Sequence, residues 1–121
     1  MAKTFRDLDV YNRAYKAALD VHALSLEYPK HEQYALADQM RRCSRSICAN
    51  IAEGFSKNYA SSQEFKRFLS MAIGSANEMI VWCDFSKDFG YLNQERHALL
   101  SQEYKELASM MYSLSSNWKA A

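Results

Sequence analysis

Few residues of this chain combine the types and the spacing that catalysis or metal binding requires. His22, His31 and His97 are scattered, and no pair of His or Cys residues has the spacing of zinc ligands. None of the Glu residues has a His three positions later, which is the pattern of a di-iron helical bundle. Each glycine stands alone, so the sequence contains no glycine-rich phosphate loop. These features predict a protein that is not an enzyme and that uses no cofactor and no metal.

Polar side chains form an ordered row along the segment 34–57, beside an apolar stripe. At helical spacing the stripe consists of Leu36, Met40, Cys43, Ile47, Ile51 and Gly54. The polar row next to it consists of Gln39, Arg42, Ser46, Asn50 and Glu53. Such a row indicates contact with another helix, and two interpretations stay open. Either the polar groups are satisfied inside one bundle, or they form an interface between subunits.

Opposite charges near the two ends of this row cannot meet along one helix. Arg42 and Glu53 are eleven residues apart, which corresponds to about 16 Å of helical rise. Between subunits, Arg42 of one copy can reach Glu53 of the next, and a head-to-tail contact of this kind can close into a ring. The subunit interpretation therefore predicts a ring-shaped homo-oligomer.

Basic residues gather in the same part of the sequence and are candidates for contact with phosphate groups. Segment 38–67 contains six basic and three acidic residues, a net charge of +3, whereas segment 78–106 has a net charge of −3. Again two interpretations stay open: the two segments are neighbouring helices that neutralise each other, or the basic one faces an anion. The candidate nucleic-acid-binding residues are Arg41, Arg45, Lys57, Lys66 and Arg67, of which Arg41 and Arg45 are expected to point outward.

Four helical segments must position these side chains. Hydrophobic residues make up 49% of the 121 residues, and three Gly and one Pro leave little room for a sheet with tight turns. The breaks follow from Pro29, from Ser61 and Asn93 as N-caps, and from Gly90 as a left-handed C-terminal residue. With the apolar periodicity, they predict helices at about 8–28, 34–57, 62–89 and 94–118. The predicted fold is all-α: an antiparallel up-down-up-down four-helix bundle that forms a single domain over 1–121.

Three residues have expected structural roles inside these helices. His22 falls on an apolar line of the first helix, and a hydrogen-bonded histidine in the core is the expectation. Gly74 and Ser75 form a small pair in the middle of the third helix. Because a glycine there costs about 1 kcal/mol of helix stability, we expect the pair to permit close approach of another helix.

Cysteine usage and hydropathy indicate a cytoplasmic protein. Cys43, Cys48 and Cys83 are an odd number without a CxxC motif, so free thiols in a reducing compartment are expected. The first residues have no apolar core of a signal peptide. No uncharged run approaches the ~20 apolar residues that a membrane span needs, so no membrane partner is expected.

The central segment also resembles a known family. The residues that carry the resemblance are Arg41-Arg42 and the run Ser46-Ile47-Cys48-Ala49-Asn50-Ile51-Ala52-Glu53-Gly54. They resemble the signature of the small four-helix-bundle proteins related to 23S rRNA intervening-sequence proteins, whose relatives include the accessory protein of diversity-generating retroelements. The similarity extends from about Phe5 to Trp118 and includes Tyr28-Pro29, Glu32, Tyr34, Leu36, the segment Ser62 to Leu69, and Gly90-Tyr91. Cys48 is a departure, because the family often has Pro there.

What the resemblance implies is a non-enzymatic bundle that assembles into a ring, since characterised members of the family form pentamers. In the retroelement branch the ring binds nucleic acid and a reverse transcriptase through basic surfaces. The implied partners are therefore RNA or DNA, as for an accessory or ribosomal-RNA-associated factor, and a reverse transcriptase or another protein. The alternative is an oligomeric scaffold that binds only proteins. An enzyme would instead require a polar pocket with His22 or His97 beside an acid.

Overall fold

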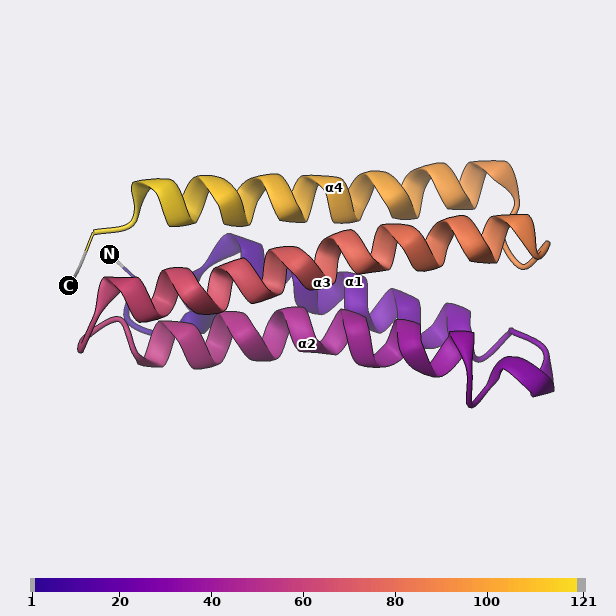
Figure 1. Ribbon diagram of the computed structural model, residues 1–121, viewed down its shortest axis with the longest axis horizontal. Helices are drawn as coiled ribbons and strands as arrows, with labels where there is room; N and C mark the ends of the chain where they lie inside the picture. Colours follow the sequence, from indigo (N-terminus) through magenta and orange to yellow (C-terminus); the bar gives the residue numbers. More distant parts are fainter. Residues whose placement is uncertain (1, 120–121) are drawn as a thin grey trace.

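Four α-helices account for most of residues 2–119, the part of the chain that the computed structural model describes. They are α1 (Asp9–Ser25), α2 (Leu36–Ser56), α3 (Ser62–Asp88) and α4 (Gln94–Asn117), with short 3-10 turns at Phe5–Asp7 and Lys30–Glu32. No strand occurs within residues 2–119. The helices lie side by side and the chain reverses direction at each connection (Figure 1). The predicted all-α fold is confirmed, and the packing of the helices is consistent with the predicted up-down bundle.

The helix ends follow the capping residues that the sequence contains. Ser61 accepts a hydrogen bond from the Glu64 backbone N–H, and Asn93 accepts one from the Arg96 backbone N–H. Gly90 follows α3 with a φ of 86°, a conformation that favours glycine. These three predictions are confirmed.

The first two helices are shorter than predicted at the connection between them. α1 ends at Ser25, and the backbone continues in tight turns in which Glu27 bonds to Leu24 and Tyr28 bonds to Ser25. Tyr28 is buried, and its ring lies 5.0 Å from the ring of Tyr91. The apolar periodicity therefore continues past the end of the helix, because the turn that follows also packs into the core.

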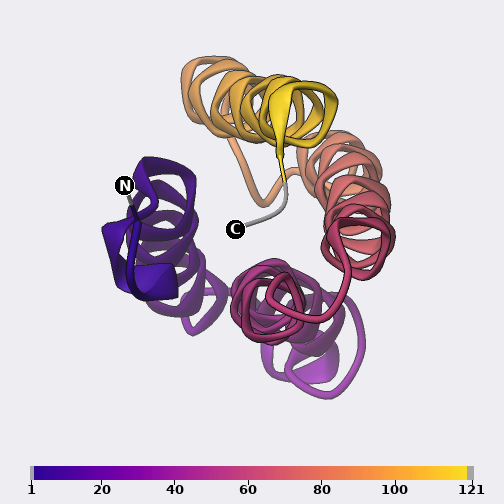
Figure 2. The ribbon, with the colours of Figure 1, turned by 90° about the vertical axis from the view of Figure 1, so that its left-hand side faces the viewer.

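The predicted apolar stripe of α2 faces the centre of the bundle. All six of its members are buried, and Met40, Ile47 and Ile51 have no exposed surface. From the opposite side, α4 contributes Tyr104 and Leu107, which are also fully buried. Viewed along the bundle, the four helices surround a common centre (Figure 2). The core is thus the region where the predicted helical stripes meet.

A glycine sets the close approach of α2 to α3, but it is not the predicted one. A Cβ on Gly54 would lie 2.5 Å from the Cβ of Phe68 and 3.0 Å from Cδ1 of Phe65. Gly74 is exposed and would meet nothing within 4 Å. Ser75, its neighbour, does face α2. The prediction of a close contact at Gly74 is therefore wrong, whereas the contact at Ser75 is present.

The contact between α1 and α4 is the least extensive of the four between neighbouring helices (Figure 2). The guanidinium of Arg13 on α1 crosses it and lies 2.6 Å from carboxylate oxygens of Glu103 and of Glu106 on α4. A second, longer ion pair joins Arg96 to Glu27 at 3.6 Å. Ion pairs thus bridge this side of the bundle, where apolar packing is less extensive.

His22 does not lie in the core. Its side chain is exposed on α1, because that helix is rotated so that the line through Val10, Ala14, Ala17, Val21 and Leu24 faces inward. The prediction of a core histidine is therefore wrong. Within residues 2–119, no helix has both the length and the apolar character that crossing a membrane requires.

Candidate assembly face and basic surface

The two ends of the predicted polar row are open to contact. Gln39, Arg42 and Glu53 are exposed on α2. The Nε of Arg42 donates to Asp38, four residues earlier on the same helix, at 2.8 Å, yet the Arg42 side chain remains 72% exposed. A surface pair of this kind contributes only ~0.3–0.5 kcal/mol. Arg42 is therefore free to exchange Asp38 for a carboxylate of another molecule at little cost.

The middle of the row is satisfied inside the bundle. Ser46 is half-buried, and its hydroxyl donates to the backbone carbonyl of Cys43 at 2.8 Å and lies 2.9 Å from the hydroxyl of Ser75 on α3. The half-buried amide of Asn50 donates to the Ser46 carbonyl at 2.9 Å. Each of the two interpretations therefore fits a different part of the row. Ser46 contacts α3 and Asn50 bonds within α2, so both are satisfied inside one bundle, and the subunit role of Gln39, Arg42 and Glu53 stays a prediction.

An exposed aromatic groove lies beside the Gln39 end of the row. The groove surrounds a hollow of about 360 Å³. One wall consists of Leu36 and Gln39 of α2 with Ala35 just before them, and the other consists of Trp82 and Phe85 of α3 with Phe89 just after its end. The three aromatic rings form a chain, with centroids 6.1 Å and then 5.8 Å apart. Phe85 is 46% exposed and Phe89 is 56% exposed. Exposed aromatic rings beside hydrogen-bonding groups are typical of protein interfaces.

The aromatic groove is not among the predicted features, although the sequence contains a pattern of aromatic residues that indicates it. Trp82, Phe85 and Phe89 recur at steps of three and four residues, so they share one side of α3. The core-facing line of the same helix passes through Met79, Cys83 and Ser86 instead. Two apolar lines on one helix indicate a second covered face. Only the packing of α2 and α4 shows which of the two lines remains exposed.

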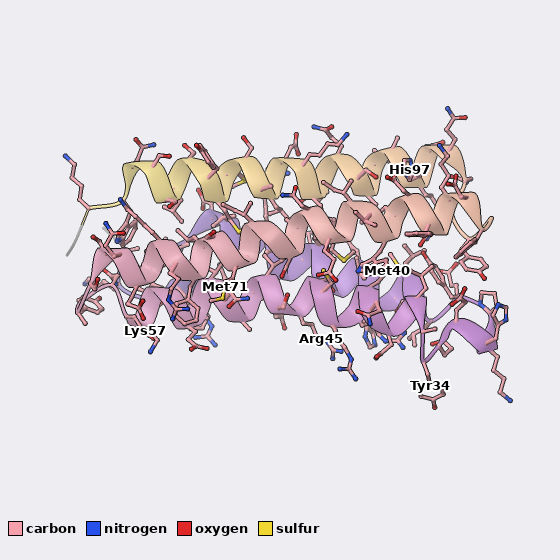
Figure 3. The ribbon with its side chains drawn as sticks, viewed as in Figure 1. Tyr34, Met40, Arg45, Lys57, Met71 and His97 are labelled. Carbon is pink, nitrogen blue, oxygen red and sulfur yellow. The ribbon has the colours of Figure 1, made fainter. Side chains whose placement is uncertain are left out.

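Arg41 does not point outward, and that prediction is wrong. Its guanidinium is half-buried against the α1–α2 connection, where Nη2 donates to the Gln33 carbonyl at 2.6 Å and Nη1 donates to the Ser25 hydroxyl at 2.9 Å. Arg45, one turn later, is exposed and points away from α3 and α4 (Figure 3). Arg41 therefore holds the α1–α2 connection against α2 through hydrogen bonds. Arg45 is the accessible member of the two arginines that were expected to point outward.

Two of the predicted basic residues, Lys57 and Arg67, lie against the same ring at the turn between α2 and α3, and Lys66 is the sequence neighbour of Arg67. The Nζ of Lys57 lies 5.9 Å from the ring centre of Phe68, and the guanidinium carbon of Arg67 lies 4.7 Å from it. Lys66 is half-buried beside them in sequence, and Arg67 also pairs with Glu64 at 2.9 Å. The pKa of Glu64 is lowered by this hydrogen bond from Arg67. We name Lys57, Lys66 and Arg67 the turn cluster.

An exposed tyrosine accompanies the turn cluster and was not a predicted residue. Tyr59 is 65% exposed in the turn itself, and its ring packs edge-on against Phe55 at 6.4 Å. Arg45 precedes Lys57 by twelve residues, about 18 Å along the helix. The structure therefore brings Lys57 and Arg67 together, with Lys66 next to Arg67 in sequence and an exposed aromatic ring in the same turn, and leaves Arg45 apart.

The three cysteine thiols are buried or half-buried. Burial raises the pKa of the Cys43 and Cys83 thiols to about 12 and that of Cys48 to about 11, so all three stay protonated near neutral pH. The half-buried His97, whose side chain is 18% exposed, contacts the 62% exposed Asp84 at 2.8 Å between α4 and α3. Within residues 2–119, no group of three or more His, Cys, Asp and Glu side chains could hold a metal ion.

A solved structure and a family profile both match this chain. The crystal structure of a protein of unknown function from the S23 ribosomal protein family of Bacteroides thetaiotaomicron is similar, with a TM-score of 0.81. It is 21% identical, and the match covers 89% of this chain and 96% of that one, which shows a shared fold. No curated protein matches the chain. The sequence profile of the 23S rRNA-intervening sequence proteins matches residues 6–113, and the chain therefore belongs to that family.

Proposed function

We propose that this chain is a non-enzymatic subunit of a ring-shaped homo-oligomer that binds single-stranded nucleic acid through repeated basic surfaces. The observation that carries the proposal is the outer side of α2. It combines two exposed, opposite charges, Arg42 and Glu53, with the aromatic groove at the Gln39 end. An apolar hollow with charged groups at its side is the composition expected of a subunit contact.

The placement of the charges favours a head-to-tail contact. Arg42 has only the weak Asp38 pair, and the carboxylate of Glu53 makes no ion pair within residues 2–119. If Arg42 of one subunit meets Glu53 of the next, each subunit uses one end of α2 to bind and presents the other end for binding. Such a contact is heterologous, and it closes into a ring when the rotation between subunits is suitable.

The turn cluster provides the proposed nucleic-acid contact. Lys57, Lys66 and Arg67 supply positive charge, and the exposed ring of Tyr59 offers a surface on which a base can stack. One such cluster is weak, and the chain as a whole carries a formal charge of only +1. A ring would repeat the cluster around its circumference, so that one strand contacts several copies at high effective concentration. Arg45 adds a further charge along α2 in each copy.

The first expected result concerns assembly. We expect light scattering on a sizing column to give a mass of several chains, near five if the ring has the size that the family resemblance implies. Arg42→Glu and Glu53→Arg should each lower this mass by placing like charges at the contact. The double variant restores opposite charges and should recover the ring. Lys105→Glu, a charge reversal on the exposed side of α4, serves as the matched control and should leave the mass unchanged.

A monomeric wild-type protein would overturn the ring. So would a double variant that assembles no better than the single ones, because the effect would then not depend on pairing between residues 42 and 53.

The second expected result concerns nucleic acid. Fluorescence anisotropy should detect binding of a single-stranded RNA that weakens as salt rises, with a slope that falls by about 0.7 for each phosphate contact removed. Lys57→Glu combined with Arg67→Glu should weaken binding at least about tenfold at low salt, and Tyr59→Ala should weaken it with little change in the salt slope. An assembled ring with no RNA or DNA affinity would instead support the scaffold that binds only proteins.

A further inference from the structure

A small groove between α1 and α2 has a one-sided charge. Its walls are Tyr15, Ala18, Leu19 and His22 from α1, and Arg41, Ser44, Arg45 and Cys48 from α2, around a hollow of about 230 Å³. The wall thus includes two arginines and a histidine, and no carboxylate. By contrast, the wall of the larger hollow between α1 and α4 has charges of both signs, from Lys16, Arg96, Asp20 and Glu103. The α1–α2 groove is therefore the one with a preference for anions.

The arginine charges of this groove are not compensated by the protein. Arg41 donates only to neutral groups, the hydroxyl of Ser25 and the amide oxygens of Gln33. The Nε of Arg45 donates to the Arg41 carbonyl at 3.0 Å. Within residues 2–119, neither arginine pairs with a carboxylate, whereas Arg13, Arg42, Arg67 and Arg96 all do. Arg41 is half-buried and already donates to three oxygens, so the exposed Arg45 is the arginine whose charge remains available to an anion.

The rest of the groove is apolar and accessible. Tyr15 is 51% exposed and Leu19 is 56% exposed, although both border a hollow whose wall also includes the buried Ala18 and the half-buried Cys48. Arg45 lines the same groove from α2 and is exposed to solvent. A ligand that fits must therefore be apolar along most of its length and negatively charged at one end.

We propose that this groove binds a small aliphatic carboxylate, with its chain against Leu19, Ala18 and Tyr15 and its carboxylate at Arg45. The volume corresponds to roughly eight groups of the size of a water molecule, which suits a chain of about eight carbons. The hollow is smaller than most drug-sized ligand sites. It is too small for a folded helix, and inorganic phosphate would leave its apolar wall uncovered. The proposal goes beyond the assembly and nucleic-acid binding above and does not depend on them.

The test is a calorimetric titration of the purified, assembled protein with sodium octanoate. Acetate, which lacks the chain, and 1-octanol, which lacks the charge, should each bind at least about tenfold more weakly than octanoate. Arg45→Gln should weaken octanoate binding at least about tenfold by removing the charged contact. Leu19→Asp should abolish it, because a carboxylate would then stand in the groove.

Matched variants elsewhere make the result specific to this groove. Arg67→Gln removes an arginine from the turn cluster, and Leu99→Asp places an acid on an exposed leucine at the α1–α4 hollow. Both should bind octanoate as the wild type does. Circular dichroism of each variant reports whether it is folded, and all four substituted side chains are exposed.

Three outcomes would overturn the proposal. Octanoate and acetate of equal affinity would show a plain anion contact, and octanoate and octanol of equal affinity would show a plain apolar contact. Binding that survives Arg45→Gln and Leu19→Asp, or that is lost in Leu99→Asp, would place the ligand elsewhere. Arg45 belongs to both proposed surfaces, so Leu19→Asp distinguishes them: RNA binding, measured separately, should persist in this variant while octanoate binding is lost.

Discussion

Replacement of Gly54 by alanine is expected to destabilise the protein by about 2–3 kcal/mol, because added atoms in a packed interface force the helices apart. The new Cβ would lie 2.5 Å from the Cβ of Phe68, an atom fixed to the backbone that cannot rotate away. Phe65, at 3.0 Å, is itself fully buried and has no space to move into. Urea unfolding followed by circular dichroism measures the loss. Gly54→Val should cost more than alanine.

Gly74→Ala is the control for this prediction. Gly74 also lies inside a helix, but a Cβ there meets no heavy atom within 4 Å. The alanine should therefore stabilise the protein by about 1 kcal/mol through its better helix propensity. The two substitutions are chemically identical and should have opposite signs. If Gly54→Ala were as stable as the wild type, α2 and α3 would be able to separate without loss, and the close contact would not hold the bundle.

Tyr104→Ala is expected to cost about 3–5 kcal/mol, the range for removal of a large buried aromatic side chain. Tyr104 has no exposed surface and lies at the centre of the bundle. Its hydroxyl, however, has no hydrogen-bond partner within residues 2–119. An unpaired buried hydroxyl carries a desolvation penalty of about 1–3 kcal/mol. Tyr104→Phe should therefore be neutral or stabilising, in contrast to the alanine variant.

The pH dependence of stability provides a second measurement on Tyr104. Burial raises the pKa of its phenol well above the ordinary value of 10.0. Above the ordinary value, the unfolded chain releases this proton while the folded protein keeps it, so stability falls as pH rises. In Tyr104→Phe this decline should be shallower, by at most about 1.4 kcal/mol per pH unit. A decline of equal slope in both proteins would show that Tyr104 ionises in the folded state.

Periodicity and capping residues in the sequence determine the helices and their inward faces. The α2 stripe from Leu36 to Gly54 is buried as predicted, because residues three and four apart share one side of a helix. Helices begin after Ser61 and Asn93, as predicted, because each side chain accepts a hydrogen bond from the backbone N–H three residues later. α3 ends before Gly90, as predicted, because glycine permits the positive φ found there. These interactions are local, so a single sequence is enough to find them.

Only the tertiary structure decides what covers each side of a helix. Arg41 was expected in solvent, but Ser25 at the end of α1 and Gln33 in the connection after it supply acceptors for its guanidinium. His22 was expected in the core, but the core receives the neighbouring line of α1. Of two mid-chain glycines, Gly54 faces Phe68 and Gly74 faces solvent, although both have helical surroundings in the sequence. The direction in which a side chain points from its helix follows from the spacing of residues in the sequence. What the side chain contacts there depends on how the four helices pack together.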